Sequence, residues 1–294
     1  MKRIGEAVSH GAITVVNAMA TGKGAALGIN LWTKARVTLT DRPGLISGRN
    51  LTDPYEDPTL MIATVKQVFR KLHDQNRFGA KVETQSCIPA AAGLKSSSAA
   101  SNAVAVATLK ALGKSESDLA TINFGVDASF AAQVTLTGAF DDACACFFGG
   151  LIVTDNVRRK ILRRFRPPKA LLRVLIYLPR KRIYTNEVDP KRLKGIRQFV
   201  DGAHDEALKG NYWLALALNG IFYSRALGYD ISPVKKALEA GALTAGLTGK
   251  GPAISAIVPT SKTDRVLSAW TELPGRIIEA SLNHEKAKPL RPVT

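Results

Sequence analysis

The chain has 294 residues, of which 46% are apolar and 6% aromatic. This is enough to bury a core in one large or two modest domains, and it excludes long disordered spans. The net charge is +17 at pH 7, and three cysteines argue against a disulfide framework. The sequence has no signal peptide and no apolar run of membrane-spanning length, so we expect a cytoplasmic protein.

The positive charge is concentrated between Arg158 and Arg197, where fifteen Lys or Arg residues stand against two acids. Such a block can bind nucleic acid. However, the apolar, strand-like segment 171–178 interrupts it, and no recognition motif accompanies it. A positive surface also attracts small anionic substrates. We therefore expect a small-molecule substrate and neither nucleic-acid nor membrane partners, with a homodimer left open.

In the first part of the chain, residues 7–17, 36–40 and 80–86 have the apolar spacing of strands. Residues 18–28 contain three glycines around Lys23 and predict a loop where backbone approaches a ligand. The alternative is an ordinary turn with a solvated lysine. The further expectations are a loop over 41–58, from its glycines and prolines, and an amphipathic helix over 59–72.

Residues 89–103 are almost all small, with three consecutive serines and Lys95 as the only charge. They lead into an alanine-rich helix predicted over 99–112. Free N–H groups and the dipole at a helix N-terminus attract anions. The stretch therefore predicts a phosphate cradle, and a serine-capped helix in a packed core is the alternative.

Two adjacent acids, Asp141 and Asp142, lie in an otherwise apolar segment between Gly138 and Gly149. Carboxylates are costly to bury without partners. A functional role is therefore favoured over simple surface exposure or helix capping.

The second half of the chain is read from its periodicity and its helix start signals. Two prolines, Pro167 and Pro168, predict a seam between an N-terminal domain, residues 1–165, and a C-terminal domain, residues 166–294. A glycine-rich turn over 246–251 precedes a strand. The further predicted helices cover 116–124, a segment from 126 on, 195–209, 212–227, 231–240 and 266–273, and the further strands cover 151–154, 171–178, 253–258 and 276–280.

Three segments together resemble the signatures of the GHMP kinases, which include galactokinase, homoserine kinase, mevalonate kinase and phosphomevalonate kinase. Residues 89–97 match the ATP loop Pro-x-x-x-Gly-Leu-x-Ser-Ser, with Lys95 in the variable slot that is usually glycine. Residues 20–25 and 246–253 match the first and third signatures in order. The resemblance implies a two-domain α+β fold. Its N-terminal domain would resemble domain 2 of ribosomal protein S5, its C-terminal domain would be ferredoxin-like, and ATP and substrate would lie in the cleft between them.

The resemblance also implies roles for single residues. Asp142 would be the general base, with Asp141 as its neighbour. Lys23 would lower the pKa of the acceptor alcohol, hold Asp142 ionised or contact the γ-phosphate. Ser97 would ligate Mg²⁺, with Asp127 as a weaker candidate for a second ligand. The expected nucleotide-binding residues are Pro89, Ala90, Ala91, Ala92, Gly93, Leu94, Lys95, Ser96, Ser97, Ser98, Ala99 and Ala100, and the expected substrate-binding residues are Thr21, Gly249 and Gly251.

Among these kinases, the variants at residues 18–26, 93–98 and 137–143 resemble the archaeal-type shikimate kinases, which transfer the γ-phosphate of ATP to the 3-hydroxyl of shikimate. A homoserine kinase or another small-molecule kinase of the group is the alternative. A nucleotide-binding protein of this fold without catalysis is the alternative from a different class. The residues that bind the shikimate carboxylate and the role of Lys95 stay open.

Overall fold

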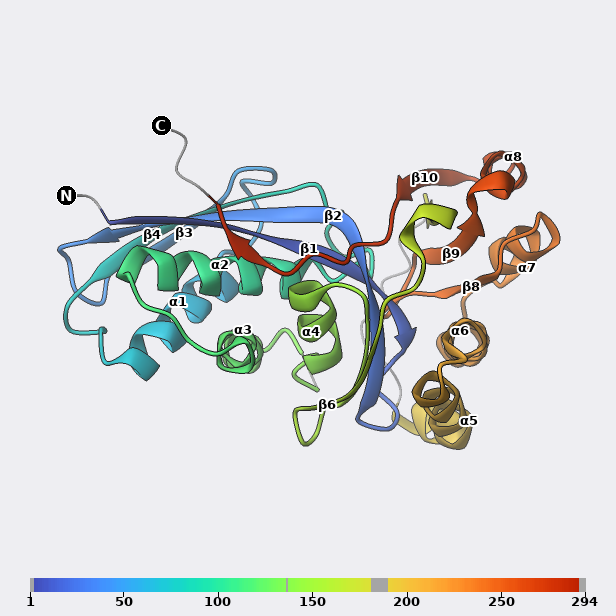
Figure 1. Ribbon diagram of the computed structural model, residues 1–294, viewed down its shortest axis with the longest axis horizontal. Coiled ribbons are helices and arrows are strands. Elements are labelled where there is room, and N and C mark those ends of the chain that lie inside the picture. The colour runs from blue at the N-terminus through green and yellow to red at the C-terminus, as the bar shows by residue number, and fades with distance from the viewer. Residues whose placement is uncertain (1–2, 136, 181–189, 291–294) are drawn as a thin grey trace.

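The computed structural model of the protein describes residues 3–135, 137–180 and 190–290. Its strands form two sheets, each with its own helices, side by side along the long axis of the molecule (Figure 1). The first sheet contains β1 (Ile4–Val16), β2 (Lys23–Thr40), β3 (Ile46–Asn50), β4 (Gly79–Ser86), β5 (Leu151–Asp155), β6 (Lys160–Phe165) and β11 (Lys288–Pro289). The helices between these strands are α1 (Thr59–Leu72), α2 (Ser96–Leu112), α3 (Asp118–Ala131) and α4 (Phe140–Phe148).

The second sheet has the antiparallel order β10-β7-β9-β8. Helix α6 packs on β8, α5 packs on α6, and α7 and α8 cover neighbouring strands. The expectation of an α+β fold is confirmed. The strands are β7 (Leu172–Pro179), β8 (Thr244–Leu247), β9 (Ile254–Pro259) and β10 (Gly275–Ala280), and the helices are α5 (Pro190–Lys209), α6 (Tyr212–Leu227), α7 (Ser232–Glu239) and α8 (Thr263–Thr271), with short 3₁₀ turns at Lys169–Leu171 and Thr260–Lys262.

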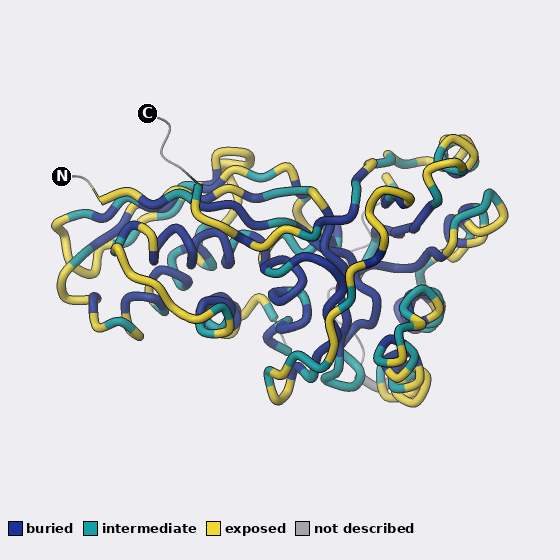
Figure 2. Tube along the Cα trace, in the orientation of Figure 1, coloured by how far each residue is buried: buried dark blue, intermediate teal, exposed yellow. Residues whose placement is uncertain are grey.

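The long strands β1 and β2 form the centre of the first sheet. Strand β2 pairs with β1 along most of its length, with β5 near its start and with β4 near its end. Helices α2 and α4 pack on these strands, and α5 and α6 also contact β1. Strand β1 is accordingly buried at almost every position from Ala7 to Val16. Figure 2 shows this buried layer as the dark blue centre of the chain trace.

Several stretches differ from the sequence expectation, and two of them lie away from the site. The predicted loop over 41–58 contains β3, which pairs in parallel with β4; its central residues Ser47, Gly48 and Arg49 carry no apolar alternation that could reveal a strand. The two helices predicted on either side of Gly125 are one helix, α3. A Cβ at Gly125 would lie 2.7 Å from Oγ of Ser101, so this glycine allows close packing on α2 and does not end the helix.

The last described residues return to the first sheet. Strand β11 pairs with β1, and the backbone N–H of Asn283 donates to the carbonyl of Gly28. The N–H of Ala287 donates to the carbonyl of Phe147, at the end of α4. The strands change sheet between β6 and β7, close to the predicted seam. The division of the chain at residue 165 stays a prediction, because this returning segment belongs to the first sheet.

Two buried threonines, Thr14 of β1 and Thr248 after β8, connect the two sheets, and we call them the threonine junction. The N–H of Thr14 donates to Oγ1 of Thr248 at 2.9 Å, and that hydroxyl donates to the carbonyl of Gly93 at 2.9 Å. In return, the N–H of Gly249 donates to Oγ1 of Thr14 at 2.8 Å. The junction therefore joins β1, the loop before α2 and the turn after β8 at one point.

Helix α6 fixes the turn between β1 and β2 next to this junction. The N–H of Asn17 donates to Oδ1 of Asn219 at 2.8 Å, and its Nδ2 donates to the carbonyl of Gly249 at 2.9 Å. The hydroxyl of Tyr223 donates to the carbonyl of Asn17 and accepts from the N–H of Ala20. All three signature segments are thus held by hydrogen bonds that cross between the two sheets.

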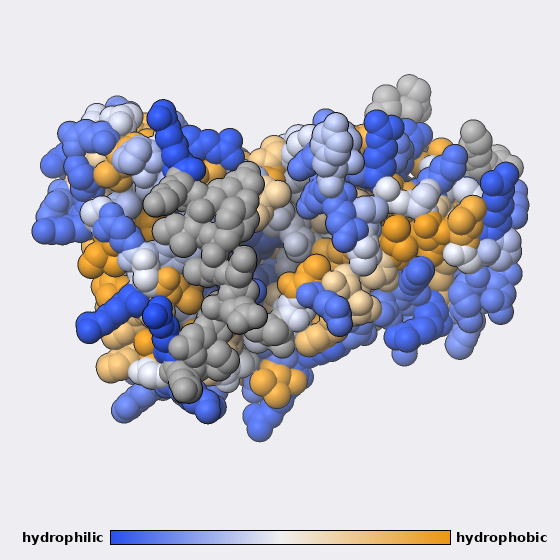
Figure 3. All heavy atoms as spheres, turned by 180° about the vertical axis from the view of Figure 1, so that it is seen from behind, coloured by the Kyte–Doolittle hydropathy of each residue, from blue (hydrophilic) through white to orange (hydrophobic). Residues whose placement is uncertain are grey.

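None of the helices described for this chain has the length and apolar character needed to cross a membrane. Figure 3 shows the face opposite to that of Figure 1, where hydrophilic side chains project from both ends and hydrophobic ones form separate patches. Such scattered apolar exposure is ordinary for a folded domain.

Replacing Thr248 by Val tests the threonine junction. The substitution keeps the shape of the side chain but leaves the N–H of Thr14 and the carbonyl of Gly93 without their partner. We expect the unfolding free energy to fall by about 1–3 kcal/mol, the cost of leaving one buried polar group, the N–H of Thr14, without its partner. Urea unfolding measures the loss, and the exposed Thr260→Val is the matched control, expected within about 0.5 kcal/mol of the parent. Equal stability of the two variants would contradict the assignment.

Candidate active site

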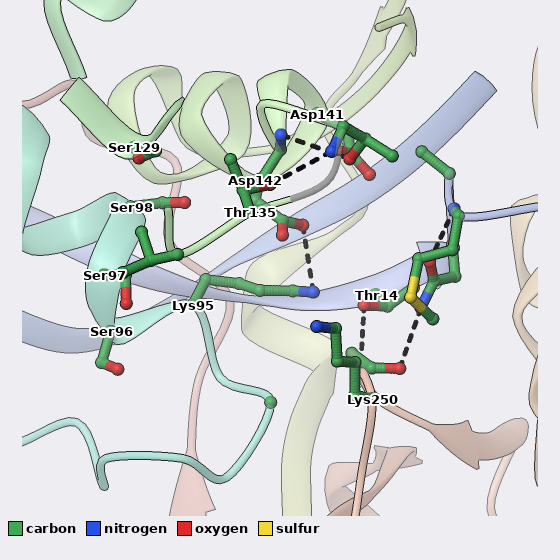
Figure 4. Close-up of a pocket in the computed structure, with 18 of the residues that line it drawn as sticks. Thr14, Lys95, Ser96, Ser97, Ser98, Ser129, Thr135, Asp141, Asp142 and Lys250 are labelled. Carbon is green, nitrogen blue, oxygen red and sulfur yellow. Dashed lines mark hydrogen bonds and ion pairs between the residues drawn. The ribbon is translucent and has the colours of Figure 1, made fainter. Parts of the chain in front are cut away.

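A cavity of about 480 Å³ lies beside the threonine junction. It is lined by four segments that are far apart in the sequence (Figure 4). They are the end of β1 with the turn after it, the serine-rich loop with the start of α2, the segment from α3 to α4, and the glycine turn after β8. The predicted site residues that line it are Ala91, Gly93, Lys95, Ser96, Ser97, Ser98, Asp141, Asp142, Gly249 and Gly251.

The start of α2 is open toward this cavity. The helix begins at Ser96, and no side chain caps it. The first helical bond runs from the N–H of Ala99 to the carbonyl of Lys95, so the N–H groups of residues 96–98 have no acceptor within the helix. These serines were expected in a loop before a helix starting at residue 99, and they form its first turn. Such an end binds anions through its N–H groups and its dipole.

The loop before α2 approaches the glycine turn so closely that only glycine fits at residue 93. A Cβ at Gly93 would lie 2.2 Å from the carbonyl oxygen of Thr248, and φ there is +77°. The side chains of Ala92, Leu94 and Ala99 are buried in the core. These three residues shape the loop from behind and do not line the cavity. The other predicted loop residues that do not line it are Pro89, Ala90 and Ala100.

The two acids lie in the first turn of α4, where the helix dipole favours negative charge. Asp141 is only 4% exposed. Its Oδ1 accepts from Nδ2 of Asn156 at 2.7 Å, and its N–H donates to Oδ1 of the same asparagine. Burial, and then the neighbouring charge of Asp142, raise the pKa of Asp141 to about 7. Asp141 therefore carries a proton through much of the acidic range.

Gly24 makes room for Asp141. A Cβ at this position would lie 2.2 Å from Oδ2 of Asp141. The sequence placed Gly24 in a ligand-binding loop over 18–28, but β2 begins at Lys23, so only the residues before it form a turn. This glycine therefore serves close packing of a strand against α4, and its role could not be read from the glycine-rich pattern.

Asp142 faces the cavity, and Lys95 is the cation beside it. Nζ of Lys95 lies 3.0 Å from Oδ1 of Asp142, and the side chains are 8% and 17% exposed. The approach lacks hydrogen-bond geometry, so Oδ1 has no hydrogen-bond partner within the described part of the chain. Figure 4 shows the Lys95 side chain running from the start of α2 toward the Asp142 carboxylate.

The structure places Lys23 elsewhere. Its Nζ pairs with Oδ1 of Asp201 on α5 at 2.9 Å, and Lys23 does not line the cavity. The hydroxyl of Thr21 bonds to the backbone of Lys23 and stabilises the turn. Asp127, the candidate second metal ligand, pairs with Arg159 at 2.8 Å. Of the two lysines singled out in the sequence, Lys95 is the one beside the acids.

Sequence reasoning missed Asn156 and Lys250. Asn156 holds Asp141 from the end of β5, and nothing local in the sequence marks it. Lys250 lines the cavity from the glycine turn, and its position between two glycines was a signal that could have drawn attention to it. Within residues 3–135, 137–180 and 190–290, no group of three or more His, Cys, Asp or Glu residues could hold a metal ion.

The protonation of Asp141 predicts a specific pH dependence of stability. The folded protein keeps this proton up to about pH 7, whereas the unfolded chain releases it near 3.8. This carboxyl therefore lowers the unfolding free energy as pH rises from about 4 to about 7. Asp141→Asn removes the titration and keeps an acceptor for Asn156.

We expect the unfolding free energy of Asp141→Asn, relative to the parent, to rise by up to about 4 kcal/mol over that pH range and to level off above it. Urea unfolding at a series of pH values measures the difference. The parent serves as the control at each pH, so that the other titrating groups cancel. A difference that does not vary with pH would show that Asp141 is already ionised in the folded protein.

Comparison with known proteins shows the family to which this chain belongs. A family model, "GHMP kinases N terminal domain", matches residues 60–150. The shikimate kinase of Methanothrix thermoacetophila is 40% identical over 284 residues, which cover 97% of this chain and 96% of that protein. The shikimate kinase of Pyrococcus furiosus is 42% identical over 282 residues, which cover 96% of this chain and all of that protein.

A solved structure, the homoserine kinase from Cytophaga hutchinsonii, is similar with a TM-score of 0.74 over 99% of this chain and 98% of that chain. At 17% identity this similarity bears on the fold alone, and it confirms the expected GHMP kinase fold. The two shikimate kinases are similar to this chain over nearly their whole length. The chain therefore belongs to the shikimate kinase family of GHMP kinases.

Proposed function

We propose that this protein transfers the γ-phosphate of ATP to the 3-hydroxyl of shikimate. The observation that carries the proposal is the 40–42% identity to shikimate kinases over nearly the whole chain. The cavity supports it, because an open helix N-terminus and a carboxylate line the same space. Phosphoryl transfer needs mainly positioning and charge neutralisation, and the cavity offers groups for both.

The proposed reaction assigns a role to each side of the cavity. The N–H groups of residues 96–98 bind phosphate oxygens of ATP. Asp142 accepts the proton of the shikimate hydroxyl while that oxygen attacks the γ-phosphorus and the bond from the γ-phosphorus to the β-phosphate oxygen breaks, releasing ADP. Asp141 stays behind Asp142, hydrogen-bonded to Asn156. Gly249 and Gly251, which line the cavity from the glycine turn, are proposed to contact the substrate.

The donor atoms in the cavity suit Mg²⁺. This ion prefers oxygen ligands and is commonly held by one or two protein oxygens together with substrate phosphates. Ser97 is an exposed residue in the first turn of α2, and its hydroxyl and the carboxylate of Asp142 line the same cavity. Ser97 is therefore the proposed protein ligand. When bound, Mg²⁺ supplies neutralisation of the phosphate charge.

Homoserine is the alternative acceptor, since a homoserine kinase has the same fold. A protein that binds nucleotide without catalysis is the alternative of another class, and it predicts ATP binding without turnover of any alcohol. The homodimer, the cytoplasmic location and the lack of nucleic-acid or membrane partners stay predictions from the sequence. A phosphorylation assay with shikimate, homoserine and mevalonate shows which of these alcohols the protein phosphorylates, and turnover of none would favour the protein that binds nucleotide without catalysis.

Asp142→Asn tests the proposed base. The substitution keeps the size of the side chain and removes its ability to accept a proton. We expect kcat with shikimate to fall about 10²–10⁴-fold, the usual contribution of a general base, with little change in ATP affinity measured by calorimetry. The exposed Asp264→Asn on α8 is the matched control, expected to keep full turnover. Undiminished turnover of Asp142→Asn would rule out the base assignment.

Ser97→Ala tests the proposed Mg²⁺ ligand. Because the substitution removes one oxygen donor, we expect the Mg²⁺ concentration for half-maximal rate to rise about tenfold. Ser96→Ala removes the neighbouring hydroxyl of the same turn and should shift this concentration less. An equal Mg²⁺ dependence in the parent and in Ser97→Ala would exclude the hydroxyl as a ligand.

A further inference from the structure

Lys95 has an unusual backbone conformation for a lysine. It occupies the N-cap position of α2 with φ +65° and ψ +33°, in the left-handed region. This conformation costs free energy for any residue with a Cβ and is readily adopted by glycine. Strained backbone of this kind persists where the surrounding structure requires it, often at active sites. This backbone conformation draws attention to what the side chain of Lys95 contacts.

The side chain of Lys95 ends between the acid pair and the glycine turn. Its Nζ lies 3.0 Å from Oδ1 of Asp142, and a Cβ on Gly249 would lie 3.4 Å from the same Nζ. The lysine side chain is 8% exposed, so water screens this pair little. By contrast, the Lys23–Asp201 pair is 44% and 35% exposed, as expected for a pair near the surface.

The position of Asp142 explains why it needs a cation. A second carboxyl, Asp141, precedes it on the same turn of α4, and like charges resist joint ionisation. Breaking a buried ion pair by removing one partner leaves an uncompensated charge. The other titratable groups near Asp142 are Cys146 on α4 and Lys250 on the glycine turn. Within the described residues, the cation that forms an ion pair with Asp142 is Lys95.

We propose that Lys95 is the positioning residue for Asp142: its ammonium lies against the carboxylate and orients it for proton transfer. In this way Lys95 replaces Lys23, for which the sequence resemblance offered three alternative roles, one of them on Asp142. The inference rests on the proposed function, because it supposes that Asp142 acts as the base. It places Lys95 outside the group of residues that grip phosphate. Its contribution should therefore appear in kcat and depend on Asp142.

A double-mutant cycle with Asp142→Asn tests this dependence. Lys95→Met keeps the length of the side chain and removes the charge, and we expect kcat to fall about 10²-fold with less than a threefold rise in KM for ATP. In the Asp142→Asn background the same substitution should change kcat less than threefold, because its target is gone. Additive losses, or a loss mainly in KM for ATP, would overturn the proposal in favour of phosphate binding by Lys95.

Chemical rescue provides a readout that a merely structural role would not give. Lys95→Gly keeps the left-handed backbone and opens the space of the removed side chain. We expect n-butylammonium to restore kcat of Lys95→Gly in a saturable way, and neutral 1-butanol to have no effect. Rescue should disappear when Lys95→Gly is combined with Asp142→Asn. Equal effects of the amine and the alcohol would overturn the proposal.

Two control lysines complete the test. Lys23→Met breaks the other lysine–aspartate pair, and its effect on kcat should be the same in the parent and in the Asp142→Asn background. If Lys23→Met, and not Lys95→Met, couples to Asp142→Asn, the proposal is wrong and the original role of Lys23 holds. The exposed Lys235→Met on α7 controls for loss of a positive charge and should leave kcat unchanged.

Failure of the proposed function is recognised separately. If the parent enzyme phosphorylates another alcohol and not shikimate, the shikimate proposal fails, and the same kinetic cycle is run with that alcohol. A second cycle on urea midpoints needs no substrate. The urea midpoint of the double variant Lys95→Met/Asp142→Asn should shift by less than the sum of the shifts of the two single variants. Additive shifts would show that the two side chains do not interact.

Discussion

The hydrogen bonds of the threonine junction set the geometry on which the site depends. The serine-rich loop leads into α2 under the first sheet, whereas the glycine turn follows β8 of the second sheet. Thr14 and Thr248 connect them through three hydrogen bonds, one of them buried and two partly buried. Buried polar groups have no water to replace a lost partner, so such bonds hold their geometry strongly. The carbonyl of Thr248 leaves no space for a Cβ on Gly93, so loop and turn fit in one arrangement.

Within this frame, two identical side chains acquire different chemistry from their surroundings. Asp141 is buried against Gly24 and Asn156, and its pKa rises to about 7. Asp142 faces the cavity beside Lys95. One carboxyl is thus engaged in a hydrogen bond, and the other is the proposed proton acceptor. Such pairs, driven apart by environment, are a recurrent way to obtain acid and base roles from one residue type.

The sequence predicted those parts of the site whose signals are local. Small residues and serines before a helix marked the uncapped start of α2 that lines the cavity, and two acids in an apolar segment marked the start of α4. The partner of Asp142 could not be predicted, because the positions of Lys23 and Lys95 relative to α4 depend on tertiary packing. Asn156 was missed for the same reason. Strand β3 escaped detection because it is defined by its pairing with β4 and not by its own residues.

The return of the chain end to the first sheet has a consequence for biosynthesis. Residues near 283–289 bond to β1, to β2 at Gly28 and to the end of the helix that carries the acid pair. In the sequence these residues follow every strand of the second sheet, so they are synthesised after it. The first sheet therefore cannot be completed before the second sheet has been synthesised.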